Sequence, residues 1–160
     1  MEITVRRATR ADIPVLGRLG ALLVRTHHAF DAKRFLPASP QTESGYGSYL
    51  GSQLDEPSVA VFVAEEDGLV IGYAYSAVEG TNYMELRGPA GVLEDIVVDP
   101  ARRRHGAGRK LLQATMEFLK SRGAPRVVLS TAVQNEAARS LFESAGFRPT
   151  MIELTAELSP

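Results

Sequence analysis

The chain has 160 residues, 44% of them hydrophobic and 23% charged, with a formal net charge of −1 and no cysteine. This length can bury a core without disulfides, and the near-neutral charge argues against a general nucleic-acid binder, which would show a basic excess. The lack of cysteine excludes disulfides, thiolate metal sites and a cysteine nucleophile.

No stretch approaches the ~18 apolar residues of a membrane span, and the N-terminus lacks the basic start and apolar run of a secretory signal. No repeat or long linker divides the chain. We therefore expect a single domain, residues 1–160, in the cytoplasm, with no membrane partner.

The N-terminal third predicts one strand and two helices. Residues 3–8 alternate apolar and polar as a strand does, and a helix is expected after them that runs to about Arg25. Residues 27–57 are interrupted by prolines and glycines, and only a short helix around 41–53 is expected there. The apolar positions at helical spacing in the first helix are Ile13, Leu16, Leu19 and Leu23.

The remaining elements predict a sheet with helices packed on it. Residues 59–66 and 69–78 read as a hairpin, because Asp67-Gly68 between them is a strong turn signal. The amphipathic helix that starts at Gly108 ends before Gly123, which stands where a C-cap glycine belongs. The other expected elements are strands at 92–98, 126–131 and 150–158, and helices at 108–122 and 136–145.

A basic loop with two glycines joins the strand at 92–98 to the helix at 108–122. Gly106 and Gly108 let backbone N–H groups turn inward without a Cβ in the way, and the helix adds the positive end of its dipole. Five cations within nine residues suit a ligand with several phosphates. They are Arg102, Arg103, Arg104, Arg109 and Lys110.

Two familiar phosphate-binding loops do not fit this segment. A P-loop needs Gly-Lys followed by Ser or Thr, whereas Gly108 is followed by Arg109-Lys110-Leu111. A dinucleotide fingerprint needs a third glycine where Leu111 stands, and an acid after the next strand, where residues 131–134 have none.

The remaining pattern, Arg103-x-x-Gly106-x-Gly108 after a strand with an acid-rich centre, resembles the pyrophosphate loop of the GCN5-related N-acetyltransferase (GNAT) superfamily. Residues 135–147, which start with Asn135 and end in Gly146-Phe147, resemble the superfamily's next motif, in which an Asn opens a helix that ends in Gly-Phe. The order and spacing of the two motifs also match. The resemblance is specific between about residues 92 and 147.

This resemblance implies an α/β (mixed α+β) fold with a mixed, mostly antiparallel sheet of six to seven strands, splayed at the fourth strand and flanked by about four helices. It implies acetyl-CoA as cosubstrate and no metal. The pantetheine arm would lie against the backbone of Ile96, Val97 and Val98. Asn135 would face the pantetheine or its bound water, and Phe142 would lie near the sulfur. The pyrophosphate would be held by Arg103, Arg104, His105, Gly106, Ala107, Gly108 and Arg109.

Aminolysis of a thioester needs a neutral amine, yet an amine with a pKa of ~10.4 is only about one part in 2,500 neutral at pH 7. Glu94 is the candidate base, because it resembles the glutamate that takes this role in several members of the superfamily. Asp95 must point to the opposite face if the strand is regular, and a bulge would relax that rule. A backbone N–H of Ile96 or Val97 would meet the developing oxyanion.

The sequence departs from the superfamily at Phe142, where many members have a tyrosine that protonates the departing thiolate. A thiol with a pKa near ~8.5 leaves fairly easily as an anion, so water or another tyrosine can serve. All five tyrosines lie in the first 83 residues. Any substitute must therefore come from another part of the fold.

We thus predict an N-acetyltransferase that moves the acetyl group of acetyl-CoA to a primary amine of an unidentified acceptor, directly in a ternary complex because no cysteine can be acylated. Phe142 leaves open a catalytically inactive acyl-CoA-binding regulatory module. Asn135 could be a plain helix N-cap, and Glu94 a salt-bridge partner of the basic loop. His27 and Asp31 do not close a metal site. No nucleic-acid partner is expected, and the superfamily's frequent dimers leave a homodimer open.

Overall fold

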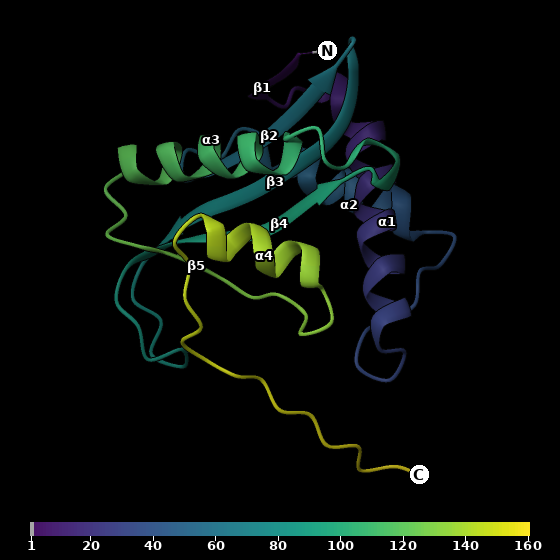
Figure 1. Cartoon of the computed structure of the whole chain (residues 1–160), viewed down its shortest axis with the longest axis vertical. Helices are drawn as coiled ribbons and strands as arrows, with labels where there is room; N and C mark the ends of the chain where they lie inside the picture. Colours follow the sequence, from purple (N-terminus) through teal and green to yellow (C-terminus); the bar gives the residue numbers. More distant parts are fainter. Residues whose placement is uncertain (1) are drawn as a thin grey trace.

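A computed structural model describes residues 2–160 and shows one sheet with helices on both of its faces (Figure 1). The strands are β1 (Ile3–Arg7), β2 (Val59–Glu66), β3 (Leu69–Glu79), β4 (Ala90–Val98) and β5 (Val127–Leu129). The helices are α1 (Ile13–Phe30), α2 (Thr42–Gln53), α3 (Ala107–Ser121) and α4 (Glu136–Ser144). Short 3-10 turns at Arg10–Asp12 and Pro100–Arg102 lead into α1 and the basic loop.

The five strands are ordered β1-β2-β3-β4-β5, as they follow in the chain. The first three pairings are antiparallel, and β4 and β5 are parallel. The β2–β3 hairpin turns at Asp67 and Gly68, whose φ angles of 52° and 76° suit the tight turn that matches strand twist. The predicted mixed, mostly antiparallel α/β fold is confirmed, with five strands instead of six to seven.

Two sequence-based predictions were wrong, one on the end of a helix and one on the existence of a strand, and the strand expected at 126–131 is shorter, at Val127–Leu129. The first helix continues to Phe30, beyond Arg25, because no glycine or proline interrupts residues 26–30. The strand expected at 150–158 is not formed, and these residues are exposed and extended. A strand needs a neighbouring strand to satisfy its backbone groups, and in the described chain this segment has none.

Alternating side chains give the sheet two apolar faces. On one face α3 and α4 cover Ile71, Ala74 and Leu93. On the other face α1 and α2 cover Val61, Val63 and Tyr73. The described chain contains no helix that is both long and apolar enough to cross a membrane.

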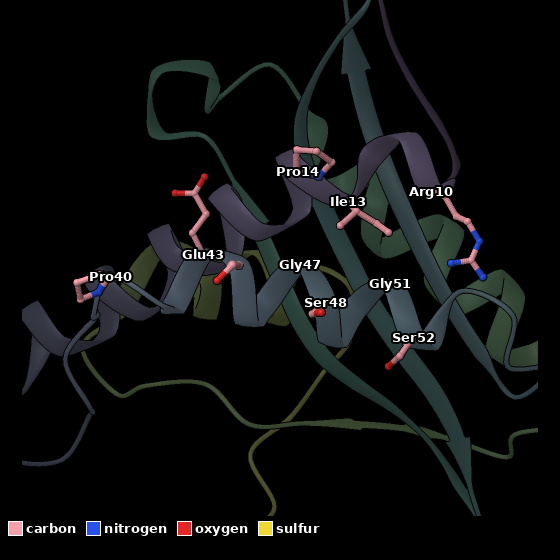
Figure 2. Close-up of a pocket in the computed structure, with 10 residues that line it drawn as sticks. Arg10, Ile13, Pro14, Pro40, Glu43, Gly47, Ser48, Gly51 and Ser52 are labelled. Atoms are coloured by element: carbon pink, nitrogen blue, oxygen red, sulfur yellow. The ribbon is translucent and has the colours of Figure 1, made fainter.

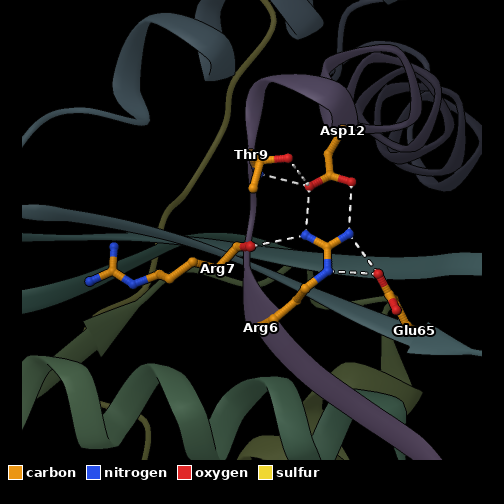
Figure 3. A network of polar contacts seen from close by, with 5 residues as sticks. All are labelled: Arg6, Arg7, Thr9, Asp12 and Glu65. Carbon is orange, nitrogen blue, oxygen red and sulfur yellow. Dashed lines mark hydrogen bonds and ion pairs between the residues drawn. The ribbon is translucent and has the colours of Figure 1, made fainter. Parts of the chain in front are cut away.

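A network around Arg6 ties the first strand to the start of α1 (Figure 3). The Arg6 guanidinium donates to both Asp12 carboxylate oxygens at 2.8 and 3.0 Å, and its Nε donates to Glu65 at 2.6 Å. Asp12 also accepts the Thr9 N–H at 2.7 Å, which closes a capping box. Hydrogen bonding by Arg6 holds the pKa of the buried Asp12 carboxyl below its usual range.

Helices α1 and α2 approach closely because glycines face each other between them. A Cβ on Gly17 would lie 2.4 Å from the Glu43 carbonyl oxygen, and one on Gly20 would lie 2.2 Å from the Tyr46 ring. Gly20 therefore leaves room for Tyr46 to lie across α1. The same contact forms an open groove on the outer side of the helix pair, lined by Ile13, Glu43 and Gly47 (Figure 2).

Candidate active site

The candidate site is centred on β4, which parts from its neighbour β5 halfway along. The two strands pair only at Gly91–Val127, Val92–Val128 and Leu93–Leu129. Strand β4 then continues to Val98, still paired with β3 on its other side. The β5-facing backbone edge of residues 94–98 therefore has no strand partner, which is the splay that the sequence comparison led us to expect.

A β-bulge interrupts β4 at Glu94. Tyr75 pairs with Asp95 and the next residue, Ser76, pairs with Leu93, so Glu94 has no partner on β3. As a result Leu93 and Ile96, three residues apart, both pack on the α3/α4 face. The expectation that Asp95 points away from Glu94 holds only for a regular strand, and this strand is bulged.

The loop after β4 presents a run of free backbone donors. Asp99 caps the turn at Pro100–Arg102, where its carboxylate accepts the Ala101 N–H at 2.9 Å. The first bond of α3 runs from the Lys110 N–H to the Gly106 carbonyl at 3.1 Å. Within residues 2–160, no hydrogen bond is donated by a backbone N–H of residues 103–109. Such a run at a helix N-terminus is suited to an anion.

Backbone conformation exposes these donors. Gly106 has φ 89°, and a Cβ there would meet no atom within 4 Å, so the space beside it is open. Arg104 also has a positive φ, 72°, which is unusual for a residue with a side chain. Gly108 lies close to α4, since a Cβ on it would be 3.3 Å from a Leu141 methyl group.

The loop's basic side chains divide into two groups. Glu66, whose side chain is only 1% exposed, accepts from Arg102 at 2.7 Å and contacts His105 Nδ1 at 3.1 Å. Lys110 Nζ donates to the Ile3 carbonyl at 2.8 Å. Arg103, Arg104 and Arg109 are exposed and form no ion pair with a described residue. The buried carboxylate thus secures the loop, and three arginines remain to face a ligand.

The bulged Glu94 lies among other ionisable groups. Partial desolvation, the neighbouring Glu79 carboxyl and the nearby Asp95 charge all raise its pKa, while Arg87 lowers it, although the Glu94 side chain is still exposed to solvent. Arg87 itself forms an ion pair with Glu79 at 2.8 Å. A carboxylate whose pKa is raised binds a proton more strongly, which favours its use as a base.

Asp95 is held in a cage of tyrosines on the α1/α2 face. The buried Tyr73 hydroxyl donates to Asp95 at 3.0 Å, and Tyr46 from α2 lies near the same carboxylate. Burial raises the Asp95 pKa, and the two tyrosines together with the nearby His27 partly offset that rise. The arrangement links α1, α2, β3 and β4 beside the bulge.

Two other tyrosines meet close to Glu94. The Tyr49 and Tyr75 hydroxyls are 3.0 Å apart, one from α2 and one from β3. Burial raises the pKa of Tyr75, and the charges of Glu94 and Asp95 add to the rise. Tyr49 is 52% exposed, so this hydroxyl pair reaches from the bulge toward solvent.

The two predicted residues on α4 have structural roles of their own. Asn135 is the N-cap, and its side chain accepts the Ala138 N–H at 3.1 Å. Phe142 is 6% exposed and belongs to the same core cluster as Leu93, Val98 and Ala107. The fold therefore brings α4, the end of β4 and the start of α3 together.

Sequence reasoning missed Glu66, Glu79 and the Asp95 cage. Glu66 lies 36 residues before Arg102, and only the pairing of β2, β3 and β4 brings the two together. Glu66 is the last residue of its strand, directly before the Asp67-Gly68 turn, and nothing in the neighbouring sequence indicates that it has an ionic partner. Tyr46 lies in the segment 27–57, which carries no chemical motif.

The parted strands β4 and β5, the bulge at Glu94 and the free N–H groups at the start of α3 are the arrangement that the sequence motifs predicted for an acyltransferase. A sequence model of the Acetyltransferase (GNAT) family matches residues 24–147. The chain belongs to this family and is an acetyltransferase, as its motifs predicted.

Individual relatives agree with this family. An uncharacterized N-acetyltransferase, YhfO of Bacillus subtilis, is 30% identical over 105 residues, covering 64% of this chain and 68% of the relative. An N-alpha-acetyltransferase of Sulfurisphaera tokodaii is 36% identical over 104 residues, 62% of each protein. A mycothiol acetyltransferase of Thermobispora bispora is 38% identical over 90 residues, but these span 54% of this chain and only 29% of that protein.

Solved structures share the fold over nearly the whole chain. A mutant of the Bacillus halodurans protein BH1408 superposes with a TM-score of 0.83 at 19% identity, covering 98% of this chain and 99% of that one. The aminoglycoside N-acetyltransferase AAC(6')-Iy, in complex with CoA, gives 0.75 at 17% identity, with coverage of 98% and 94%. A predicted acetyltransferase with acetyl-CoA from Clostridium acetobutylicum gives 0.70 at 20% identity, with coverage of 98% and 97%.

Proposed function

We propose that the protein transfers the acetyl group of acetyl-CoA to a primary amine, by direct attack in a ternary complex. The observation that carries this proposal is the bulge at Glu94, where β4 has left β5 on the strand that leads into the free N–H groups of residues 103–109. Relatives named N-acetyltransferases support an amine as the acceptor.

The residues present fit acetyl-CoA. Free backbone donors and the exposed Arg103, Arg104 and Arg109 suit its pyrophosphate, and the unpaired edge of residues 94–98 suits the amide groups of its pantetheine arm. Structural neighbours that hold CoA or acetyl-CoA on the same fold support this choice. The bound molecule would supply a thioester whose carbonyl carbon accepts the amine.

Glu94 would take the proton that the acceptor amine must lose. Its raised pKa makes it a better base than an ordinary surface glutamate. The Asp99 N–H donates to Ile71 on β3, so alternation along β4 directs the Val97 N–H to β3 and the Ile96 N–H to the parted edge. Of these two candidates Ile96 would therefore stabilise the negative charge on the carbonyl oxygen, an effect worth about 3 kcal/mol for one such donor.

A proton for the departing thiolate would come from the Tyr75–Tyr49 hydroxyl pair, because Phe142 has no proton to give. Their 3.0 Å contact joins Glu94's surroundings to solvent, so protons can be exchanged along it. A tyrosine is protonated at neutral pH, and a proton that Tyr75 gives up would be replaced from solvent through Tyr49.

The direct test is to measure coenzyme A release with a thiol reagent over a panel of primary amines. The protein has no cysteine, so it adds no thiol signal of its own. Release that depends on both acetyl-CoA and an amine is expected. If acetyl-CoA binds but no amine of the panel, including peptides with free N-termini, releases coenzyme A, the inactive regulatory module becomes the better account.

A further inference from the structure

The loop between β3 and β4 displays three large apolar side chains to solvent. Tyr83 is 79% exposed, Met84 89% and Leu86 88%. The loop projects from the end of the sheet (Figure 1). A group of exposed apolar side chains marks a surface that binds something, whereas a single one needs no explanation. We call Tyr83, Met84 and Leu86 the apolar tip.

The loop that carries the apolar tip has its own hydrogen bonds. Asn82 and Arg87 exchange backbone hydrogen bonds at 2.9 and 3.1 Å, and the Leu86 N–H donates to the Tyr83 carbonyl at 3.2 Å. The Asn82 side chain accepts the Met84 N–H at 3.0 Å. Leu86 has φ 54°, an unfavourable conformation for a residue with a bulky side chain. The loop therefore holds its apolar side chains in water by a defined structure.

Arg87 ties this loop to the surroundings of Glu94. Its guanidinium forms the 2.8 Å ion pair with Glu79, and its side chain is only 15% exposed. Glu79 neighbours Glu94. Alternation along β3 places Glu79 on the same face as Tyr75 and Ala77, which is the α1/α2 face. The loop is thus joined, through Glu79, to the surface that carries the candidate base.

The base of the loop lies well away from Glu94 along the strand. Ala90, the first residue of β4, pairs with Glu79, and Glu94 lies four residues further on. At about 3.3 Å per residue this separation is roughly 13 Å. An extended polypeptide covers it with about four residues. An acceptor whose amine lies at Glu94 can therefore reach the apolar tip only if it is a long chain.

Area and charge favour a polypeptide over other occupants of the apolar tip. A stable dimer buries about 800 Å² on each partner, more than three side chains offer at about 150–250 Å² each. An anionic membrane surface attracts clustered cations, whereas in this loop Arg87 is paired with Glu79 and Glu85 is an exposed acid. Glu94 adds a further carboxylate, and an acidic surface suits the positively charged amino group of an incoming chain.

We propose that the apolar tip is the docking surface for a polypeptide acceptor, and that it binds an apolar side chain about four residues from the amine that reacts at Glu94. This proposal rests on the proposed transfer to an amine and adds the class of acceptor to it. The tip contributes affinity and leaves the chemistry at Glu94 unchanged. Its effect therefore belongs to the KM of long acceptors alone.

The first test compares acceptors by coenzyme A release. The long probes are peptides of about eight residues, roughly 26 Å when extended, with a randomised first residue and either leucine or serine in the middle positions. Amides of single amino acids are the short probes. We expect kcat/KM to be roughly 10-fold higher for the leucine peptides than for the serine peptides. Equal values, with release from both, would overturn the docking surface and leave the transfer intact; no release from any amine would remove the transfer itself.

The second test changes the apolar tip. Met84→Ser and Leu86→Ser should each raise the KM of the leucine peptides roughly 10-fold, with kcat and the kinetics of the short amides unchanged. Leu69→Ser is the matched control, because Leu69 is 57% exposed at the other end of β3 and should change neither. An unchanged melting temperature shift with acetyl-CoA shows that each variant is folded. A natural KM in both tip variants would contradict the proposal.

Binding without turnover identifies the partner. A leucine peptide whose N-terminus is already acetylated cannot react, but it should bind the natural protein in calorimetry and bind Met84→Ser more weakly. Sedimentation velocity and sedimentation with phosphatidylserine vesicles test the other occupants. A dimer that Met84→Ser dissociates, or vesicle binding that it abolishes, would assign the tip to a second copy or to a membrane and overturn the proposal.

Discussion

The two faces of the sheet teach different lessons about how a site is encoded. On the α3/α4 face the candidate cofactor site depends on backbone: two parted strands, a loop of free N–H groups and glycines with open space beside them. On the α1/α2 face the candidate acceptor side depends on side chains from four elements that meet around Asp95 and Tyr75. The candidate cofactor site can be recognised from a local sequence motif, whereas the residues around Asp95 and Tyr75 come together only when the chain folds.

Substitution of Glu94 is expected to give the largest difference between the effect on turnover and the effect on acetyl-CoA affinity. Glu94→Gln removes the base but leaves the loop intact, so kcat should fall by roughly 10²–10⁴-fold while the dissociation constant for acetyl-CoA stays unchanged. Steady-state kinetics and calorimetry separate the two quantities. The matched control is Glu85→Gln, an exposed acid between β3 and β4 whose removal should change neither. Unchanged turnover in Glu94→Gln would remove the base assignment.

The opposite pattern, weaker acetyl-CoA binding with unchanged kcat, is expected for a substitution in the loop of residues 103–109. Gly106 has φ 89°, so Gly106→Val should cost about 1–2 kcal/mol in backbone conformation and weaken acetyl-CoA binding by roughly 5–30-fold. The variant should retain its kcat at saturation. Gly80→Val, in open space at another loop and without a positive φ, is the control. Equal affinity of both variants would contradict a backbone anchor at Gly106.

Substitution of Glu66 tests whether its contacts with Arg102 and His105 are needed to position the loop of residues 103–109. Glu66→Gln breaks the contacts to Arg102 and His105, so KM for acetyl-CoA should rise several-fold with kcat unchanged. Hydrogen bonding by Arg102 lowers the pKa of Glu66, so its contribution to stability is present above the ordinary carboxyl pKa and is lost as the pH falls. Glu66→Gln should therefore flatten the acid side of the stability curve. A variant with the natural KM would make this contact structural only.

The pH dependence of turnover reports on the ionisable groups around Glu94. Glu94 acts only when it is deprotonated, and burial and Glu79 raise its pKa, so kcat should rise with pH through that raised value. Glu79→Gln removes one cause of the rise. The acid limb of the profile should then move to lower pH, with the maximum rate little changed. A shift to higher pH would mean that Glu79 does not act on Glu94.

The smallest effect on catalysis is expected at the Arg6 network. Asp12→Asn should cost about 1.5–3 kcal/mol of stability at neutral pH, because a buried charged hydrogen bond is lost, and should leave kcat unchanged. The folded-state pKa of Asp12 is depressed, so the natural protein loses this stability as the pH falls through that pKa. Urea unfolding at pH 7 and at about pH 2, below the ordinary carboxyl pKa, measures both; a loss that is equal at both pH values would contradict the assignment.

Periodicity and turn chemistry were enough to predict the helices and the hairpin at Asp67-Gly68, because each follows from neighbouring residues. The parting of β4 from β5 was predicted only through the resemblance to the superfamily. The bulge at Glu94 could not be predicted, since it depends on how β4 registers against Tyr75 and Ser76. The strand expected at 150–158 is not formed, because the described chain offers it no neighbouring strand.

The most direct test of the cofactor site is the melting temperature with and without acetyl-CoA, with ADP as a control ligand and Gly106→Val as a control protein. At 100 times the dissociation constant a ligand adds about 2.7 kcal/mol, or roughly 5 to 10 °C for a chain of this size. We predict a shift of that order for the natural sequence and a smaller one for Gly106→Val at the same concentration. No shift with acetyl-CoA would contradict the assignment of residues 103–109 as its anchor.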